Sequence, residues 1–332
     1  MGTEETLKRA VGQLDAVRAE ISKVIVGQQD VVDGVLICLL AGGHVLLEGV
    51  PGLGKTTLLR TLARVLHLKY SRIQFTPDLM PADIVGSMIM ETDDRGAKAL
   101  SFQPGPIFSN LVLADEINRA TPKTQSALLE AMQERTVTSG NTTHELDLPF
   151  LVMATQNPIE MEGTYPLPEA QLDRFFFKLA LAYPSAAEVA AIIERTTAGA
   201  DVALARVMDA AGIAELKRLV REVPVAEPVR DYAIRLALAT RPGSPGATEL
   251  VNRYVRYGSS PRGPQALVLG AKSRALFDGR LTAGCEDVRA VALPALRHRL
   301  LLNFEGEAEG VAAERIVADV LDHVALPEGA PA

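Results

Sequence analysis

The sequence is poor in aromatic residues and in cysteine, and each shortage excludes a class of protein. Among 332 residues there is no tryptophan, and aromatic residues make up only 5%. The core must therefore be aliphatic, which suits helices packed on a parallel sheet better than a β-sandwich. The two cysteines, Cys38 and Cys285, show no CxxC spacing, and the five histidines are scattered. We predict neither a disulfide framework nor a metal-binding cluster of such residues, and we expect a reducing, cytoplasmic location.

Basic charge and long apolar runs are also scarce. The net charge of −7 and the pI near 5.4 argue against a protein whose main partner is a phosphate backbone. The longest apolar stretch, Val35 to Leu47, is too short to cross a bilayer, and no basic-then-apolar leader precedes it. We therefore expect neither a nucleic-acid partner nor membrane insertion. What is present, 48% hydrophobic and 23% charged residues, is typical of a globular chain with room for two domains.

Apolar runs of strand length alternate with helical patterns in the first half of the chain. Leu7 to Val24 has apolar residues every three or four positions, which predicts an amphipathic helix, and a second helix is expected from about Gln28 to Leu40. Runs of strand length then occur at residues 44–48, 69–75, 111–115, 150–155 and 175–181. The alternation predicts an α/β fold built on a doubly wound parallel sheet.

Two segments interrupt this alternation and have the pattern of hairpins. Residues 87–103 contain the turn sequence DDRG, and residues 134–148 contain SGN. After Pro184 the patterns are helical, with Gly and Pro breaks at 242–246 and 258–264. We therefore predict an α/β domain at residues 1–184 and a helical domain at residues 185–332.

The most specific motif is GVPGLGKT at residues 49–56, which matches the phosphate-binding loop Gly-x₄-Gly-Lys-Ser/Thr. It follows a buried strand and precedes an apolar-periodic helix at residues 57–66, so glycine amides and a helix N-terminus would face phosphate. This context favours a P-loop over a purely structural turn. Lys55 is expected to reach the β- and γ-phosphates of ATP, and Thr56 to bind Mg²⁺. The predicted nucleotide-binding residues are Gly49, Val50, Pro51, Gly52, Leu53, Gly54, Lys55, Thr56 and Thr57.

Polar side chains at the ends of two later strands supply the other groups that ATP hydrolysis needs. In LVLADE, residues 111–116, Asp115 is expected to hold Mg²⁺ directly or through water, and Glu116 to polarise the water that attacks the γ-phosphate. The alternative is a solvated pair of acids at a strand end. In FLVMATQNP, residues 150–158, Asn157 is expected to hold the same water, although an Asn before Pro is commonly a turn former.

Arg174, in DRFFF directly before the last predicted strand, is either a salt-bridged surface arginine or an arginine finger. A finger is delivered to the γ-phosphate from an adjacent subunit and stabilises charge in the transition state. The order of residues alone does not decide between these roles.

The order of these motifs resembles the MoxR family of AAA+ ATPases along the whole chain. The resemblance rests on VGQ (26–28), IQFTPDLMPADIVGS (73–87), FQPGPIFSNLVLADEINRA (102–120), TQSALLEAMQER (124–135), GTYPLPEAQLDRF (163–175) and LRHRLLLNFEGEAEG (296–310). It implies an AAA+ domain with a helix-2 insert hairpin and a hairpin before sensor 1, followed by an all-α lid. It also implies catalytic roles for residues already singled out: Asn157 as sensor 1, Arg174 as a finger acting in trans, and Arg262 in SSPRGP as the sensor-2 arginine of the lid.

Two further positions follow from the resemblance. Val26 and Gly27, with Ile25, lie where the family closes on the adenine, although apolar residues between two helices are expected in any case. Pro264 departs from the small residues that usually follow the sensor-2 arginine, which affects where that helix starts.

The resemblance implies an ATP- and Mg²⁺-dependent chaperone that works as a ring, with six subunits expected, and matures a client protein beside a von Willebrand A domain partner. One alternative is the motor subunit of a metal chelatase or of a Rubisco-activating complex. Another is a nucleic-acid translocase, against which stand the acidic pI and the tip residues Asp93, Asp94 and Arg95 of the first hairpin. A third is a scaffold that binds nucleotide without hydrolysing it, against which stands the full catalytic set.

Overall fold

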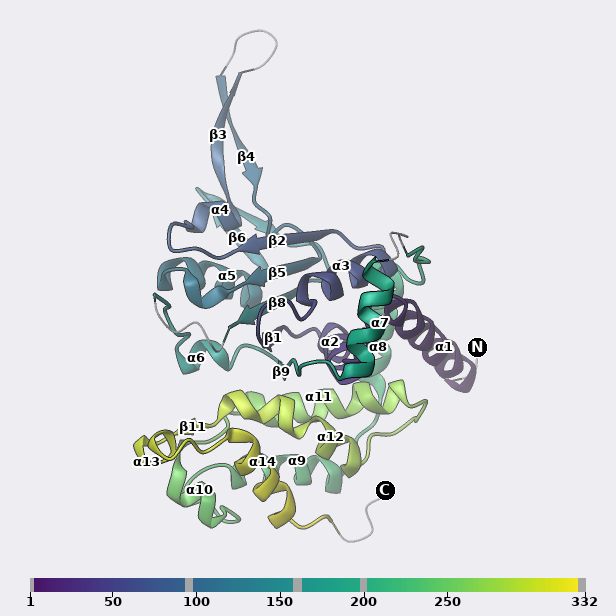
Figure 1. Cartoon of the computed structure of the whole chain (residues 1–332), viewed down its shortest axis with the longest axis vertical. Helices are drawn as coiled ribbons and strands as arrows, with labels where there is room; N and C mark the ends of the chain where they lie inside the picture. The colour runs from purple at the N-terminus through teal and green to yellow at the C-terminus, as the bar shows by residue number, and fades with distance from the viewer. Residues whose placement is uncertain (1–2, 93–97, 158–162, 198–201, 328–332) are drawn as a thin grey trace.

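A parallel sheet forms the centre of the first half of the computed structural model, which describes residues 3–92, 98–157, 163–197 and 202–327 (Figure 1). In these residues the sheet has five strands in the order β2-β5-β8-β1-β9. The strands are β1 (Val45–Glu48), β2 (Tyr70–Gln74), β5 (Leu111–Asp115), β8 (Leu151–Gln156) and β9 (Phe177–Ala180). All pairings are parallel, so the strand ends that carry the predicted motifs meet at one edge. The predicted parallel sheet is confirmed.

Alternating side chains of each strand enter different parts of the core, as the period of two in a strand requires. Val45 and Leu47 join the cluster formed with the N-terminal helices and the C-terminal helices, whereas Leu46 joins a second cluster on the other face. The helices nearest the sheet are α1 (Thr3–Ser22), α2 (Gln29–Ala41), α3 (Lys55–Val65), α4 (Pro81–Val85), η1 (Ile117–Arg119), α5 (Pro122–Glu134) and α6 (Glu169–Leu172). Both faces of the sheet are therefore covered, as expected for a parallel sheet.

Two antiparallel hairpins project from this domain on the side of β2 (Figure 1). The first pairs β3 (Gly86–Thr92) with β4 (Lys98–Pro104), and the second pairs β6 (Thr136–Ser139) with β7 (Thr142–Glu145). Gly140 has a φ of 61° in the second turn, a conformation that glycine adopts without strain. Both predicted hairpins are confirmed, although most of the first turn, with Asp93, Asp94 and Arg95, lies outside the described residues.

The second half of the chain is mainly helical. It contains α7 (Ala186–Thr197), α8 (Ala210–Glu222), α9 (Glu227–Ala239), α10 (Glu249–Tyr254), α11 (Arg262–Phe277), α12 (Cys285–Leu296), η2 (Arg297–Arg299), α13 (Phe304–Ala308) and α14 (Ala313–His323). The short strands β10 (Val255–Tyr257) and β11 (Leu301–Leu302) pair with each other. Elements α9 to α14 form a layer beneath the sheet domain (Figure 1). Across the described ranges, no helix combines the length and the apolar character that a membrane span requires.

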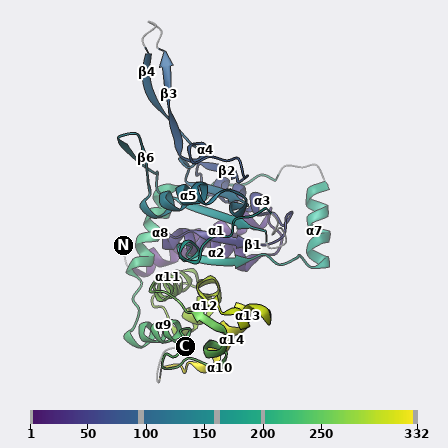
Figure 2. The same cartoon turned by 90° about the vertical axis from the view of Figure 1, so that its left-hand side faces the viewer.

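Helices α7 and α8 differ from this layer, because they flank the sheet domain. Figure 2 places them on opposite sides of that domain. Helix α8 packs on both α2 and α11, so it touches the sheet domain and the helical layer alike. The domain boundary near residue 185 stays a prediction.

Candidate functional site

The GVPGLGKT segment forms the connection from β1 to α3 at the carboxyl edge of the sheet. Gly52 and Gly54 have φ values of 86° and 80°, a region that disfavours residues with a side chain, and Gly54 is the N-cap of α3. Gly49 packs closely on Leu181, the residue that follows β9, because a Cβ on Gly49 would lie 2.8 Å from the Cβ of Leu181. The loop therefore ends on the first turn of an eleven-residue helix, whose free N–H groups suit an anion.

Lys55 lies among the groups that the sequence analysis placed around phosphate. Its ammonium donates a hydrogen bond to the carbonyl oxygen of Gly49. Burial lowers the pKa of Lys55, while the carboxylates of Asp115, Glu116 and Glu48 oppose that shift. The carboxyl edge thus brings the lysine of the P-loop and the acidic pair of β5 into one electrostatic site, as predicted.

Asp115 is oriented by neighbours on both sides. Thr155 Oγ1 of β8 donates to its Oδ1 at 2.7 Å, and Arg72 of β2 donates to its Oδ2 at 2.7 Å. The described residues hold no cluster of three or more His, Cys, Asp or Glu side chains suited to a metal. Mg²⁺ in nucleotide sites needs only one or two protein oxygens beside phosphate and water. Thr56 and Asp115 supply such oxygens, so the residues fit Mg²⁺ bound with ATP.

Glu116 is held in a conformation that most residues avoid, with φ at 57°. Its N–H donates to Thr155 Oγ1 at 2.8 Å. Gln74 Nε2 and Arg119 Nη1 both donate to its Oε2, at 2.9 and 3.0 Å. Sequence reasoning missed Thr155 and Gln74, although a polar residue inside or at the end of an apolar strand is a signal that can be looked for.

The remaining predicted residues of this edge also lie near the loop. Asn157 directly follows β8 and is only 5% exposed. Gln28, next to Val26 and Gly27, donates from Nε2 to the carbonyl oxygen of Leu53 at 3.3 Å. This contact ties the segment expected at the adenine to the P-loop.

Arg174 and Arg262 lie at the opposite, amino edge of the sheet. Arg174 precedes β9 and donates to the carbonyl oxygen of Leu129 at 2.9 Å. Arg262 begins α11 and donates to Asp173 Oδ2 at 3.2 Å, while the buried Arg299 donates to Asp173 Oδ1 at 2.9 Å. Pro264 falls in the first turn of α11, where proline is tolerated, so the helix starts at the sensor-2 position despite it.

The two edges are separated by the length of the strands. Strand β1 has four residues and therefore spans about 13 Å. Arg262 is held by Asp173 and Arg174 by Leu129, both on the amino-edge side. The structure brings Lys55, Asp115 and Glu116 together and keeps the two predicted arginines away from them.

More cations surround the end of α2, which points to the same amino edge. Lys217 and Arg135 lie beside Gly42, and Lys272 donates to the backbone of Arg221 at 2.9 Å. Burial lowers the pKa of Lys217, and the charges of Arg135 and Arg221 lower it further. Within the described ranges, none of these four side chains lies within 4.0 Å of a carboxylate. We call Arg135, Lys217, Arg221 and Lys272 the cation cluster.

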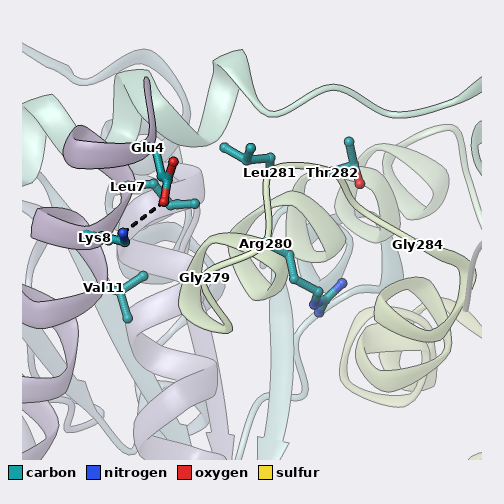
Figure 3. A pocket seen from close by; sticks show the side chains of 9 residues that line it. All are labelled: Glu4, Leu7, Lys8, Val11, Gly279, Arg280, Leu281, Thr282 and Gly284. Atoms are coloured by element: carbon teal, nitrogen blue, oxygen red, sulfur yellow. Dashed lines mark hydrogen bonds and ion pairs between the residues drawn. The ribbon is translucent and has the colours of Figure 1, made fainter. Parts of the chain in front are cut away.

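A cavity of about 580 Å³ lies elsewhere, between α1 and the loop that follows α11 (Figure 3). Leu7 and Val11 line it from α1, Leu281 lines it from the loop, and Lys8 is paired with Glu4 beside them. None of its lining residues belongs to the P-loop or to the acidic pair. This cavity is therefore separate from the candidate nucleotide site, and its volume does not identify it as the site of hydrolysis.

Comparison with known proteins agrees with this site. A profile of the ATPase family associated with various cellular activities (AAA) matches residues 44–177, and a profile of the AAA lid domain matches residues 247–320. The chain is 43% identical to Chaperone MoxR1 of Mycobacterium tuberculosis over 327 residues, which is 98% of this chain and 86% of that protein. It is 36% identical to Protein MoxR of Paracoccus denitrificans over 302 residues, 86% of this chain and 87% of that protein.

A solved structure supports the same assignment along nearly the full chain. The crystal structure of a candidate ATPase from Cytophaga hutchinsonii superposes with a TM-score of 0.92 at 41% identity, covering 98% of each chain. The chain therefore belongs to the MoxR family of AAA+ ATPases and is itself an ATPase.

Proposed function

We propose that this chain hydrolyses Mg-ATP at sites shared between adjacent subunits of a ring, and that it uses the energy for chaperone-like maturation of a client protein. AAA+ proteins generally assemble into rings. The observation that carries the proposal is the position of Arg174 and Arg262 at the amino edge, opposite the P-loop of their own chain. Six subunits are the expected ring size.

The carboxyl edge supplies one half of the site. The amides of residues 49–57 and the ammonium of Lys55 bind phosphate, and Thr56 and Asp115 hold Mg²⁺, which neutralises charge on the phosphates. Glu116 accepts a proton from the attacking water, and Asn157 orients that water. Gln74 and Arg119 hold Glu116 through Oε2, so the proposed contact with the attacking water uses the other carboxylate oxygen, Oε1. Val26 and Gly27 close on the adenine.

The amino edge of the next subunit supplies the other half. Arg174 and Arg262 place positive charge beside the γ-phosphate as its bond to the leaving group breaks. Charge favours this orientation, since one edge carries Glu48, Asp115, Glu116 and ATP, while the other carries both arginines and the cation cluster. Head-to-tail contacts of this kind form a ring when the rotation from copy to copy closes on the first copy.

The client role is proposed from a relative that is named as a chaperone, Chaperone MoxR1. The partner, a von Willebrand A domain protein, is proposed from the resemblance to the MoxR family. The β3–β4 hairpin offers an apolar contact, because Met88, Met90 and Leu100 are 43%, 63% and 66% exposed on one face of its ladder. Cytoplasmic location remains part of the proposal, supported by two free, buried cysteines.

The test of catalysis by neighbours measures hydrolysis per subunit against protein concentration, with the mass followed by light scattering. The rate per subunit should rise as the ring assembles. An unchanged rate in a demonstrably monomeric protein contradicts the shared site.

The test of the proposed client function uses a purified von Willebrand A domain protein as the probe. We expect it to bind in ATP and to stimulate hydrolysis, and we expect a Met90→Ser, Leu100→Ser variant to lose stimulation but keep basal hydrolysis. Stimulation by DNA would favour the translocase alternative, and a stable complex with chelatase subunits would favour the motor alternative.

A further inference from the structure

Helix α7 contacts the protein through one narrow face and leaves an apolar stripe exposed on the other side. Glu188 lies against Gly27, where a Cβ would meet its carboxylate, and Arg195 donates to the carbonyl oxygen of Ser22 at 2.7 Å. None of the twelve residues of α7 is buried. Ala191 and Ile192 are half-buried on the same inner face. An amphipathic helix normally packs its apolar stripe against the core, whereas α7 divides its apolar residues between the inner face and the outer face.

The outward face carries a continuous apolar stripe. Ala186, Val189, Ala190 and Ile193 are spaced i, i+3, i+4 and i+7, which places them on one side of a helix. Val189 is 39% exposed and Ile193 55% exposed, and Tyr183, just before the helix, is 73% exposed. This spacing is that of a seam between packed helices, so a partner is needed to remove the stripe from water.

The place of α7 in the fold narrows the choice of partner. The helix follows the carboxyl end of β9, the edge that carries the P-loop, and Figure 2 shows it projecting from that side. Helix α8, with Lys217 and Arg221 of the cation cluster, lies on the opposite side (Figure 2). A head-to-tail contact between copies would bring α7 of one copy against the amino edge of the next.

Charge and area agree with a second copy as the partner. Glu194 borders the stripe and, within the described ranges, has no cation within 4.0 Å, while the cation cluster has no carboxylate. A helix of twelve residues is about 18 Å long, and its stripe is too small to provide the roughly 800 Å² that each partner contributes to a stable interface. The stripe therefore suits one part of a larger interface.

We propose that the outward stripe of α7 docks on the amino-edge surface of a second copy of this chain, beside the cation cluster. This inference rests on the proposed ring and extends it to a defined contact. Because Glu188 touches Gly27 and Arg195 holds the end of α1, docking of α7 links subunit contact to the segment expected at the adenine.

The first experiment compares a Val189→Gln, Ile193→Gln variant with the wild-type chain, with Mg²⁺ and a non-hydrolysable ATP analogue present. Analytical ultracentrifugation should show the concentration of half-assembly raised by about tenfold or more. The far-UV circular dichroism spectrum and the thermal unfolding midpoint of the subunit should stay at wild-type values, which excludes misfolding. The matched control is Ile234→Gln, Leu238→Gln, two exposed residues with the same spacing on α9.

A photoreactive phenylalanine at position 193 identifies the partner in the purified protein. Crosslinks to the amino-edge surface of a second copy support the proposal. Crosslinks only within one chain, or assembly of the double variant at wild-type concentrations, overturn it. A failure of the proposed function gives a different result: Arg174→Ala would keep the wild-type rate of hydrolysis, whether or not α7 docks on a second copy.

Discussion

The two edges of the sheet are built from different chemistry. At the carboxyl edge, glycines with positive φ and acidic side chains surround Lys55. At the amino edge, arginines dominate, and Arg299 is 8% exposed with its charge shared between Asp173 and backbone carbonyls. Phosphoryl transfer needs a loop that binds the phosphates and a cation that neutralises the charge developing in the transition state. The carboxyl edge has the loop, and the amino edge has the cations. The comparison indicates that one fold supplies two half-sites to two different neighbours.

The edges also differ in how firmly their groups are held. Glu116 is bound by Gln74 and Arg119, contacts between side chains that can be exchanged. Burial lowers the pKa of Arg299 to about 10, an effect that Asp173 opposes, so this arginine is locked into the interior. The carboxyl edge is therefore suited to change with the nucleotide, and the amino edge to present a fixed surface.

The largest effect is expected from removing the finger. Arg174→Ala should lower the rate of hydrolysis by about 10³-fold or more, because the guanidinium acts on charge that develops in the transition state. ATP binding should remain, since Arg174 is away from its own P-loop. Steady-state kinetics and nucleotide titration measure both quantities. Arg315→Ala, an exposed arginine on α14, is the control. If Arg174→Ala lost ATP binding as well as hydrolysis, Arg174 would belong to the nucleotide site of its own chain, which contradicts the proposed finger role.

The next effect tests the carboxyl edge. Glu116→Gln should reduce hydrolysis by about 10²-fold or more while ATP stays bound, because an amide keeps the size of the side chain but is a poor base. Rapid-quench measurements of bound ATP check this. Normal turnover would mean that another group orients the water and that Glu116 is only an acid at a strand end.

A structural substitution tests the firmness of the amino edge. Asp173→Asn should destabilise the chain by about 3 kcal/mol, because it leaves the charge of Arg299 buried without its partner. Urea unfolding gives the value. Asp322→Asn, whose side chain is 83% exposed, should change stability by less than about 0.5 kcal/mol. Equal effects of the two variants would show that the amino edge is not fixed by this pair.

Lys55→Ala should weaken ATP binding by roughly 10- to 150-fold. The reason is that the loss of a charged hydrogen bond costs about 1.5–3 kcal/mol. The backbone amides of the loop remain but do not neutralise phosphate charge. Fluorescent-nucleotide titration measures the affinity, and wild-type binding by the variant would remove the basis of the P-loop assignment.

The last prediction concerns the pH dependence of stability and a buried histidine at the start of β1. Burial lowers the pKa of His44 from 6.5 to about 4, and its Nδ1 accepts from the N–H of Val152 at 3.0 Å. The unfolded imidazole binds a proton below pH 6.5, whereas the folded one stays neutral until about pH 4. Its contribution to stability is complete above pH 6.5 and falls by about 1.4 kcal/mol per pH unit as the pH drops toward 4.

Two variants isolate this effect in unfolding experiments between pH 7.5 and 4.5. His44→Gln should flatten the acid limb of the stability curve, because the titrating group is gone. His67→Asn removes an exposed imidazole and should leave the limb unchanged. The same slope in His44→Gln and wild type would assign the acid sensitivity to other groups.

Much of the fold could be predicted because the strands and helices follow from local patterns of apolar residues. Runs such as LVLAD (111–115) are apolar, short and bounded, and each became a strand of the sheet. The helix-forming patterns at residues 7–24 and 28–40 likewise matched α1 within four residues and α2 within one residue at each end. The P-loop motif fixed the chemistry of one edge, since its spacing is specific and its strand and helix context was visible.

The remaining features depend on contacts between distant segments. The meeting of Gln74, Thr155 and Glu116 requires the order of β2, β5 and β8 in the sheet, which no single run encodes. The orientation of α7 was equally hidden, because its sequence predicts an amphipathic helix but not which face contacts the protein. Arg262 lies at the amino edge because the helical layer packs there and Arg262 donates to Asp173. Its own sequence segment does not encode this position.

The central claim is that the two edges act together only across subunits, and mixing two inactive variants tests it most directly. Lys55→Ala lacks a working loop but offers Arg174, and Arg174→Ala has a working loop but no finger. Neither should hydrolyse ATP alone. Mixed rings, verified by mass, should regain part of the wild-type rate and lose it on dilution. Verified mixed rings that stay inactive would contradict the account.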